Sequence, residues 1–414
     1  MLRAPSQRRR VAGVVAGASL ALALASCTSS PSSDDQAAGS DGGGGTGDST
    51  ETATPPEPFR ATVVQPASGK AVAVNTTVTV KADSGTLSDV SVYRGKRQPQ
   101  HMVSGEMSAD GSAWRASELL EPGAKYTVVS RGTNDEGAQA RTLRHTFSTQ
   151  DLSLDEQTYP TVAPVQGETV GVGMPVIVTF DVPVTDRAEI ERHLEVSSTP
   201  QVQGTWHWLS DNEVHYRPKS YWPAGTNVDV DVNINGVDAG NGIYGQENRE
   251  VSFKVGDSII STVNVASHQM KVDVNGKTAR TVPITAGAPG FTTRSGIKLI
   301  VEKFESKRMD AATVGVQPGD PDYYNIPNVE YAMRVTYSGE FLHAAPWSEG
   351  SQGYSNVSHG CVGMSTEDAA WLFNMSHRGD VVKVVGSDRP LEDGNGWTDW
   401  DMSWKQYQAG SALS

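Results

Sequence analysis

The sequence predicts a mainly β protein with several domains. The chain has 414 residues, which corresponds to two to four domains at about 100–200 residues each. Short runs of β-branched residues alternate with turn residues, and the composition includes 42 glycines and 22 prolines. This composition excludes a coiled coil, a collagen and a polytopic membrane protein. We expect two small β-sandwiches followed by a third β-rich domain with one clear helix.

Charge and cysteine content exclude further classes of protein. The formal net charge is −14, so the surface as a whole repels phosphates and anionic headgroups, and we expect no nucleic acid partner. The chain has two cysteines, Cys27 and Cys361. Because at most one disulfide can form, a disulfide framework is excluded.

Residues 1–26 have the features of an export signal. Four arginines precede residues 11–25, all of which are apolar or small. This stretch of about 15 residues is shorter than a membrane-spanning helix, which needs about 20. The stretch ends in Leu-Ala-Ser-Cys27, which resembles the bacterial lipobox, where the signal is removed before the cysteine and the cysteine is acylated. We therefore expect a lipid on Cys27 that holds the protein on the outer face of the cell membrane. In the alternative, an ordinary secretory signal, Cys27 has no role.

Residues 27–58 predict a flexible tether. The segment consists mainly of Ser, Asp, Gly, Thr and Pro and includes four consecutive glycines. Such a segment cannot bury enough apolar surface to offset the entropy lost on ordering. A flexible chain of about 30 residues spans roughly 30 Å, which is enough to hold the folded part away from the membrane.

Residues 59–150 and 151–255 each predict a small β-sandwich. Polar and apolar side chains alternate in the sequence TTVTVK at 76–81, and PVIVTF at 175–180 is a buried strand in the second domain. About 90 residues with turns at this spacing are typical of an immunoglobulin-like sandwich. The two domains end similarly, in HTFS and VSFK, which favours a tandem repeat.

Neither sandwich shows a cluster of catalytic residue types. Trp206, His207, Trp208 and His215 lie on strand-like runs, so we expect them to pack in the core or across strands rather than to bind a ligand. The two domains are therefore interpreted as spacers.

Residues 256–386 form the third predicted domain. Asn275-Gly276 is a strong hairpin signal between two strand-like runs. A helix is expected over 366–377, because Ser365 or Thr366 can cap its start and Gly379 can end it. The tail, 387–414, is rich in tryptophan, and we expect these rings to anchor the tail by packing; stacking on sugars is the alternative.

Cys361 is the leading candidate for chemistry in this domain. If Cys27 carries a lipid, Cys361 is an unpaired thiol in an oxidising compartment, where unused thiols are rare. A thiol needs a base or a cationic or dipolar group to become a thiolate. His359 lies two residues before it, Gly360 lets backbone amides turn toward a bound carbonyl, and His343 ends the run 331–341. This pattern favours a cysteine nucleophile with a histidine base.

Three other interpretations of Cys361 remain open. It could be a buried small apolar residue, or it could form an intermolecular disulfide. Cys361, His359 and His343 could also hold zinc, although no CxxC or HExxH spacing and no obvious fourth ligand accompany them.

The spacing of these residues resembles that of the L,D-transpeptidase family of bacterial cell-wall enzymes, in particular its membrane-anchored actinobacterial members. The family has a His, about 14–17 residues, and then Ser/Thr-His-Gly-Cys, a hydrophobic residue and usually Asn. Here 14 residues separate His343 from Ser358-His359-Gly360-Cys361-Val362, and Gly363 replaces the Asn. The likeness extends to SGEFLH at 338–343, RGDVV at 378–382 and the Trp-rich tail.

The resemblance implies roles for the residues that match the motif. Cys361 would attack the carbonyl between the meso-diaminopimelyl residue and the terminal D-Ala of a stem tetrapeptide, and a thioester would remain. His343 would be the general base, oriented by a backbone carbonyl such as that of Ala344. The amides of Gly360 and Cys361 would form an oxyanion hole, with His359 shaping the site.

The resemblance also implies the substrate contacts and the reaction. Ser358 belongs to the motif beside the substrate, and Tyr324 and Met309 fall in the segment 309–327 that resembles a lid. The side-chain amine of a second, acceptor stem peptide would then attack the thioester and give a 3→3 cross-link, with no cofactor and no metal. A carbapenem would acylate the same thiol. An L,D-carboxypeptidase that uses water, and a non-catalytic lipoprotein that binds wall polymer or protein, are the alternatives.

Overall fold

The computed structural model describes residues 56–67, 69–137 and 140–414. The predicted signal at 1–26, the lipid site Cys27 and the tether up to residue 55 lie outside the described residues. Among the described helices, none is both long enough and apolar enough to cross a membrane.

The first domain is a sandwich of two four-stranded sheets that share one core. Trp114, Tyr126 and Phe147 are buried in this core, and the last two rings stack at 5.3 Å. The strand expected over 71–81 is shorter than predicted: only its end pairs in a sheet, although Val74 and Val78 are fully buried. The alternating apolar residues of this segment are therefore buried both in a loop and in the strand that follows it. The sheets are β1 (Arg60–Gln65), β2 (Thr79–Ser84), β6 (Ala113–Ala116), β5 (Gly105–Met107), and β4 (Met102–Val103), β3 (Thr86–Arg94), β7 (Lys125–Thr133), β8 (Arg141–Ser148).

The second domain is also a sandwich of two four-stranded sheets, with a small third sheet and the short helix α1 (Arg187–Glu191). Trp206 and Trp208 are buried, and they pack against Tyr216 at 5.3 Å and Phe180 at 5.8 Å. The prediction that these tryptophans pack in the core is confirmed. The strands are β10 (Pro160–Ala163), β12 (Val176–Phe180), β15 (Glu213–Pro218), β14 (Gly204–Ser210), then β11 (Thr169–Val170), β19 (Arg249–Val255), β16 (Asn227–Val232), β13 (Leu194–Thr199), and β17 (Asp238–Gly240), β18 (Ile243–Gly245), β9 (Gln157–Thr158).

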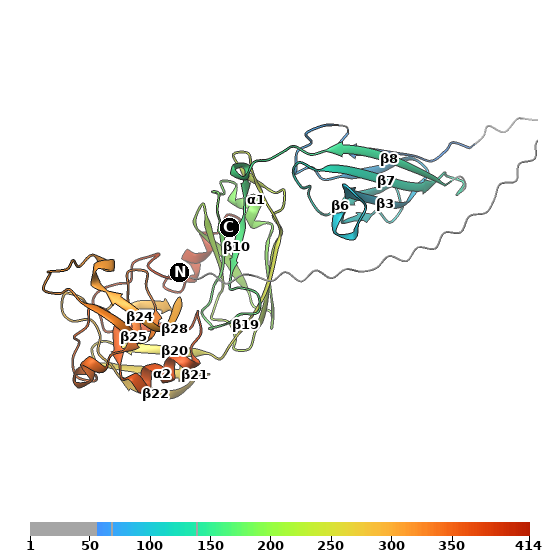
Figure 1. Cartoon of the computed structure of the whole chain (residues 1–414). Coiled ribbons are helices and arrows are strands. Elements are labelled where there is room, and N and C mark those ends of the chain that lie inside the picture. The colour runs from blue at the N-terminus through green and yellow to red at the C-terminus, as the bar shows by residue number, and fades with distance from the viewer. Residues whose placement is uncertain (1–55, 68, 138–139) are drawn as a thin grey trace, which may run out of the picture. The chain divides into compact units, whose positions relative to one another are not determined.

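The third domain contains a five-stranded and a four-stranded sheet, which pack around a shared core with the helix α2 (Thr366–Met375) (Figure 1). The four-stranded sheet carries the site residues: His343 lies on β26, and Cys361 directly precedes β27, the strand that pairs with β26 in parallel. The strands are β22 (Lys277–Pro283), β21 (Gln269–Val274), β20 (Ile259–Asn264), β28 (Val381–Val385), β23 (Gly296–Leu299), and β24 (Glu302–Asp310), β25 (Asn325–Arg334), β26 (Phe341–Ala344), β27 (Val362–Met364).

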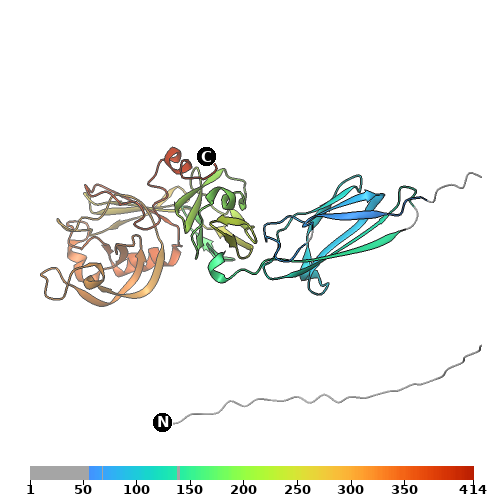
Figure 2. The ribbon, with the colours of Figure 1, turned by 90° about the horizontal axis from the view of Figure 1, so that it is seen from above.

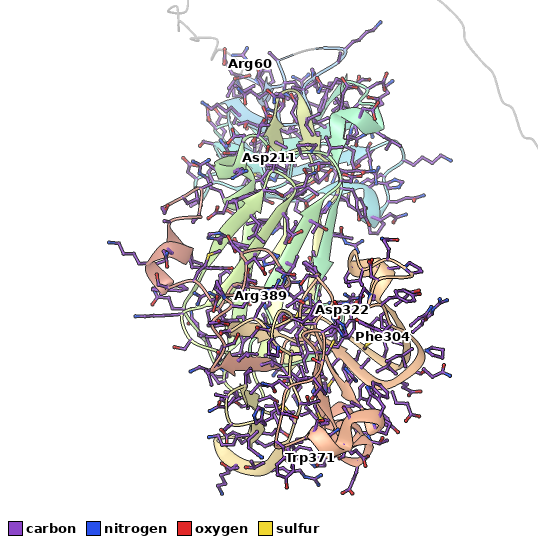
Figure 3. All side chains as sticks on the ribbon, turned by 90° about the vertical axis from the view of Figure 1, so that its left-hand side faces the viewer. Arg60, Asp211, Phe304, Asp322, Trp371 and Arg389 are labelled. Atoms are coloured by element: carbon purple, nitrogen blue, oxygen red, sulfur yellow. The ribbon has the colours of Figure 1, made fainter. Side chains whose placement is uncertain are left out.

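Helix α2 begins where the sequence predicts and ends earlier. The Ser365 hydroxyl accepts from the Asp368 amide at 3.1 Å and caps the first turn. The helix ends at Met375, because Ser376 is already extended, and Gly379 forms a later turn. Trp371, labelled in Figure 3, lies on this helix and stacks under the Arg280 guanidinium.

The second sandwich and the third domain share a continuous interface. The amides of Gly171 and Gly173 donate to the carbonyls of Arg378 at 2.7 Å and Gly379 at 2.9 Å. Leu299, Val301 and Val381 of the third domain belong to the same apolar core as the second sandwich. The two domains are therefore one packed unit along this interface.

The C-terminal tail crosses the same interface and ends on the second sandwich. Trp400 donates from its indole nitrogen to the Gly173 carbonyl at 2.6 Å, and Trp397 is buried. Helix α3 (Trp404–Gln408) lies beside the second sandwich (Figure 2), where the Tyr407 carbonyl contacts His207 Nδ1 at 2.8 Å. The tryptophans thus pack as anchors of the tail, as expected.

His215 is held between the second sandwich and this tail. Its ring nitrogens lie 2.8 Å from Asp399 and 2.8 Å from Glu213. These carboxylates outweigh the effect of burial and raise the pKa of His215 to about 9. His215 is therefore part of a buried ion pair and not only of the apolar core that the sequence suggested.

Replacing Asp380 by Asn should stabilise the protein more at pH 8 than at pH 5. Asp380 is buried at the same interface, and burial raises the pKa of its carboxyl to about 8. Since the unfolded carboxyl titrates near 4, the folded state holds the extra proton between about pH 4 and 8, and wild-type stability falls as pH rises through this window, by up to about 1.4 kcal/mol per unit. Melting temperatures of wild type and Asp380→Asn across pH 5–8 measure the effect. The exposed Asp322→Asn is the control, and a difference independent of pH would contradict the assignment.

Candidate active site

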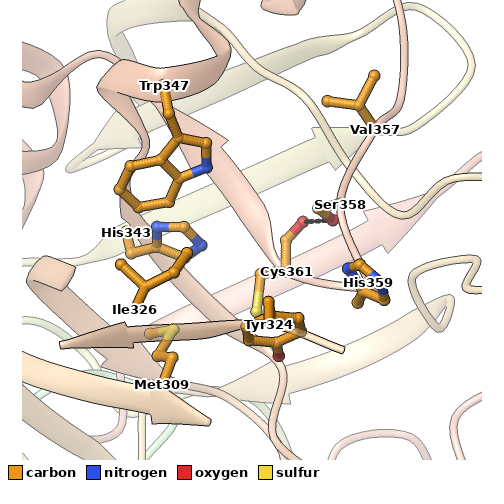
Figure 4. Close-up of a pocket in the computed structure, with 9 residues that line it drawn as sticks. All are labelled: Met309, Tyr324, Ile326, His343, Trp347, Val357, Ser358, His359 and Cys361. Atoms are coloured by element: carbon orange, nitrogen blue, oxygen red, sulfur yellow. Dashed lines mark hydrogen bonds between the residues drawn. The ribbon is translucent and has the colours of Figure 1, made fainter. Parts of the chain in front are cut away.

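Cys361 lies in the turn that leads into β27, next to the strand that carries His343. Strands β26 and β27 pair in parallel with His343 opposite Gly363, so the residue two positions before Gly363 lies near the imidazole. Gly360 adopts φ +118°, which favours glycine and aims the following thiol into the pocket. Figure 4 shows Cys361 between His343 and His359. The structure therefore brings together the three residues that the spacing predicted.

Hydrogen bonds on both sides hold this turn in place. The Ser358 hydroxyl donates to the Cys361 carbonyl at 2.6 Å and accepts from the Gly360 amide at 3.1 Å. The Thr293 hydroxyl donates to the Gly360 carbonyl at 2.8 Å and accepts from the Gly287 amide at 2.9 Å. Ser358 thus acts on the backbone of the turn, and its hydroxyl accepts from the Gly360 amide, for which the family resemblance implied a place in an oxyanion hole.

His343 is fixed in one tautomer. It is buried, and its Nδ1 lies 2.7 Å from the Ala344 carbonyl oxygen, the acceptor that the family resemblance implied. A carbonyl can only accept, so Nδ1 carries the proton and Nε2 of the neutral ring is free to accept another. The Trp347 ring stacks on the imidazole at 5.8 Å. Burial lowers the pKa of His343, although the bond to Ala344 opposes this shift.

The Cys361 side chain is a buried, protonated thiol. The sulfur donates to the Gly339 carbonyl at 3.6 Å, and within the described part of the chain Cys361 and His343 are not hydrogen-bonded to each other. Burial raises the pKa of the thiol to about 12. The two groups therefore meet as a neutral thiol and a neutral imidazole, and a proton must move between them before the sulfur can attack.

A pocket of about 280 Å³ opens over the thiol. The hairpin of β24 and β25 supplies one wall, with Met309 near the end of β24 and Ile326 at the start of β25. Tyr324 lies between these strands and packs its ring 4.9 Å from that of His359. The full lining is Met309, Tyr324, Ile326, His343, Trp347, Val357, Ser358, His359 and Cys361 (Figure 4). Both residues expected from the lid segment therefore line the pocket.

The His359 ring packs between aromatic side chains, whereas the His343 ring is held by a backbone hydrogen bond. It is exposed and lies between Phe291, at a centroid distance of 4.5 Å, and Tyr324. Among residues 56–67, 69–137 and 140–414, no group of three or more His, Cys, Asp or Glu side chains is placed to hold a metal ion.

Gly363 occupies the position where the motif usually has Asn, and its surroundings are tight. A Cβ at Gly363 would lie 2.8 Å from the Ala345 Cβ and 3.1 Å from the Thr285 Cγ2. Gly363 and Thr285 also exchange two backbone hydrogen bonds of 2.9 Å. A larger side chain would displace these neighbours, so the close approach of the two segments favours glycine here.

A group of buried charges behind the turn was not predicted from the sequence. Glu340 and Lys298 form an ion pair in which both side chains are almost fully buried, and Arg294 Nη1 lies 3.0 Å from the same carboxylate. The signal that could have found them is a lysine inside the apolar run GIKLIV at 296–301, because a charge in such a run needs a partner.

The rate of Cys361 alkylation should rise about tenfold per pH unit from pH 7 to pH 10 and reach no plateau. The reason is that a thiol of pKa about 12 stays protonated throughout this range, so each unit multiplies the thiolate fraction by ten. Intact-mass kinetics with iodoacetamide measure the rate in a Cys27→Ser background, which leaves Cys361 as the one thiol of the chain. A plateau near neutral pH would instead show a preformed thiolate–imidazolium pair.

Comparisons with known proteins agree on two domain types. A model of a bacterial Ig domain matches residues 69–238, and a model of the L,D-transpeptidase catalytic domain matches residues 258–384. L,D-transpeptidase 2 of Mycobacterium tuberculosis (strain CDC 1551 / Oshkosh) is 38% identical over 344 residues, which cover 82% of each chain. L,D-transpeptidase 5 of M. tuberculosis H37Rv is 34% identical over 331 residues, or 75% of this chain and 68% of that one.

Solved structures of shorter chains are also similar. The structure of the L,D-transpeptidase LdtMt1 in complex with imipenem has 38% sequence identity and a TM-score of 0.48, and the match covers 54% of this chain and 97% of that one. An L,D-transpeptidase from Mycobacterium smegmatis has 35% identity and a TM-score of 0.46, with coverage of 55% and 99%.

Proposed function

Because this chain belongs to the L,D-transpeptidase family, we propose that it forms 3→3 cross-links between peptidoglycan stem peptides through a thioester on Cys361. One observation carries this proposal: the buried thiol shares a pocket with an imidazole whose Nδ1 is tied to the Ala344 carbonyl. A base with a fixed tautomer beside a nucleophile in a pocket is the arrangement that acyl transfer needs.

In the acylation step, His343 Nε2 takes the thiol proton and the sulfur attacks the carbonyl between meso-diaminopimelate and the terminal D-Ala of the donor stem. The carbon–nitrogen bond of the tetrahedral intermediate then breaks, and the imidazolium returns the proton to the leaving nitrogen. Free D-Ala departs, and the stem tripeptide remains on Cys361 as a thioester. General base catalysis of this kind contributes about 10²–10⁴-fold.

In the second step, an amine replaces the thiolate. The side-chain amine of the acceptor stem's meso-diaminopimelate attacks the thioester carbonyl, and His343 takes a proton from the attacking nitrogen. The carbon–sulfur bond breaks, the thiol regains its proton and an amide joins the two stems. The choice of amine over water separates a transpeptidase from an L,D-carboxypeptidase.

The turn at Cys361 would also stabilise the negative oxygen of both intermediates. Backbone amides aimed at such an oxygen contribute about 3–4 kcal/mol each. The Cys361 amide is one candidate, and the Gly360 amide becomes a second if the Ser358 hydroxyl, which accepts from it at 3.1 Å, turns away when substrate binds. In this proposal Ser358 controls the oxyanion hole, and Tyr324 and Met309 contact the substrate from the lid.

The proposed site of action is the outer face of the cell membrane, with a lipid on Cys27. The lipobox-like end of the signal supports it. Labelling cells with a palmitate analogue tests the anchor: wild type should carry the label in the membrane fraction, and Cys27→Ser should lose it and appear in the medium. Label that persists in Cys27→Ser would overturn the anchor.

Two assays on the purified protein test the reaction. With imipenem, the β-lactam carbonyl should acylate Cys361 and add the inhibitor's mass to the intact protein. With disaccharide tetrapeptide, mass spectrometry should find free D-Ala and a cross-linked dimer. Tripeptide without dimer would instead indicate an L,D-carboxypeptidase. A folded protein that forms neither product nor adduct would overturn the enzymatic proposal and favour a wall-binding lipoprotein.

A further inference from the structure

Four charged groups, two of them almost fully buried, form a network behind the nucleophile turn. The Glu340 carboxylate accepts from Lys298 Nζ and, at 3.0 Å each, from the backbone amide and Nη1 of Arg294. Arg294 also pairs with Glu392 at the surface. Lys298 is 1% exposed and Glu340 3%. Each polar atom of the central carboxylate therefore has a partner, and the network is closed.

Burying this ion pair costs free energy that an apolar pair would not. Removing two charges from water is expensive, and replacement by well-packed apolar residues is often neutral or stabilising. Stability alone therefore gives no reason for a lysine inside the apolar strand β23. The position of Lys298 behind the reacting thiol of Cys361 offers a functional reason for this lysine.

The backbone around Glu340 touches the sulfur directly. The thiol donates to the carbonyl of Gly339 at 3.6 Å, and the Phe341 backbone lowers the pKa of the same thiol. Glu340 lies between these two residues, and its carboxylate packs against the turn, because a Cβ at Gly360 would lie 3.6 Å from Glu340 Oε1. The ion pair thus holds the segment that contacts the nucleophile.

The two members of the pair act on the thiol with opposite signs. The negative charge of Glu340 raises the pKa of Cys361, and the positive charges of Lys298 and Arg334 lower it. The other titratable groups facing the thiol line the pocket, and they are His343, His359 and Tyr324.

We propose that Lys298 and Glu340 are positioning residues for the nucleophile: Glu340 fixes the 339–341 segment and the Gly360 turn, and Lys298 stabilises the thiolate that forms when His343 takes the proton. The inference rests on the proposed role of Cys361 as nucleophile.

The test compares charge-neutralising variants by their alkylation kinetics. In the Cys27→Ser background, iodoacetamide should modify Cys361 roughly tenfold more slowly in Lys298→Met and roughly tenfold faster in Glu340→Gln, which corresponds to one pKa unit in each direction. The double variant should fall between them, and Lys298→Arg should restore the wild-type rate. A purely structural pair would change both rates in the same direction.

The control removes a cation of the same domain that lies away from the thiol. Arg280→Met breaks an ion pair with Asp368 at 2.7 Å, and its alkylation profile should coincide with that of wild type. Circular dichroism and thermal unfolding show whether each variant is folded. If a single variant of the buried pair does not fold, the partly exposed Arg294→Met replaces it and should slow alkylation, because Glu340 loses its second cation.

Equal profiles in folded Lys298→Met and Glu340→Gln, or shifts of the same sign, would overturn the proposal. So would an unchanged rate in Arg294→Met when that variant is needed. The alkylation assay does not depend on transpeptidation. A wild-type protein that makes no cross-link would therefore overturn the proposed function. The alkylation rates of the variants would still test whether the ion pair positions the thiol.

Discussion

Cys361→Ala should abolish both imipenem acylation and cross-link formation. The variant removes the sulfur that forms the thioester, and no other thiol lies among the described residues. Loss of a nucleophile that acts together with its base costs about 10⁴-fold or more, because the remaining groups cannot supply the covalent step. Intact-mass spectrometry after exposure to imipenem and dimer formation from disaccharide tetrapeptide measure the two effects.

The loss in Cys361→Ala must be separated from damage to the fold. Cys361 is 7% exposed and packs with Met309 and Phe341. Truncation to Ala leaves a small cavity, so we expect a melting temperature only a few degrees below wild type. Cys27→Ser is the matched control, since it removes the other cysteine and should keep full acylation. An adduct that still forms in folded Cys361→Ala would place the nucleophile elsewhere.

Short-range signals predicted the core of the candidate site. Two adjacent parallel strands bring together the motif residues His343, Ser358, His359, Gly360 and Cys361. The glycine of the motif, Gly360, stands where the backbone adopts φ +118°. These are local requirements, so they are visible in a single sequence. The cap of α2 by Ser365 is local in the same way.

Contacts between distant parts of the chain could not be predicted in this way. Lys298 and Glu340 are 42 residues apart, and each looks like an ordinary charge until the fold brings them together. The bond from Trp400 to the Gly173 carbonyl joins residues 227 positions apart. The role of Ser358 as a partner of the Gly360 amide was also missed, because it depends on the direction of one hydroxyl group.

His343→Gln should reduce acylation by about 10²–10⁴-fold while leaving the fold intact. Gln has a similar length and can keep a hydrogen bond to the Ala344 carbonyl, but its amide cannot take the thiol proton. The residual rate should rise with pH, because the thiol must then lose its proton to solvent, and its pKa of about 12 lies far above the working range. Imipenem acylation rates between pH 7 and pH 10 measure both effects.

His359→Gln is the informative comparison for His343→Gln, because the two histidines are equally prominent in the motif. The exposed His359 ring packs between the tilted rings of Phe291 and Tyr324, so it shapes the pocket wall. Its loss should weaken acylation far less than the loss of His343 and should leave the pH dependence of wild type unchanged. If His359→Gln instead had the larger effect and the altered pH profile, the general base would be His359. The tautomer fixed by Ala344 would then serve only to orient His343.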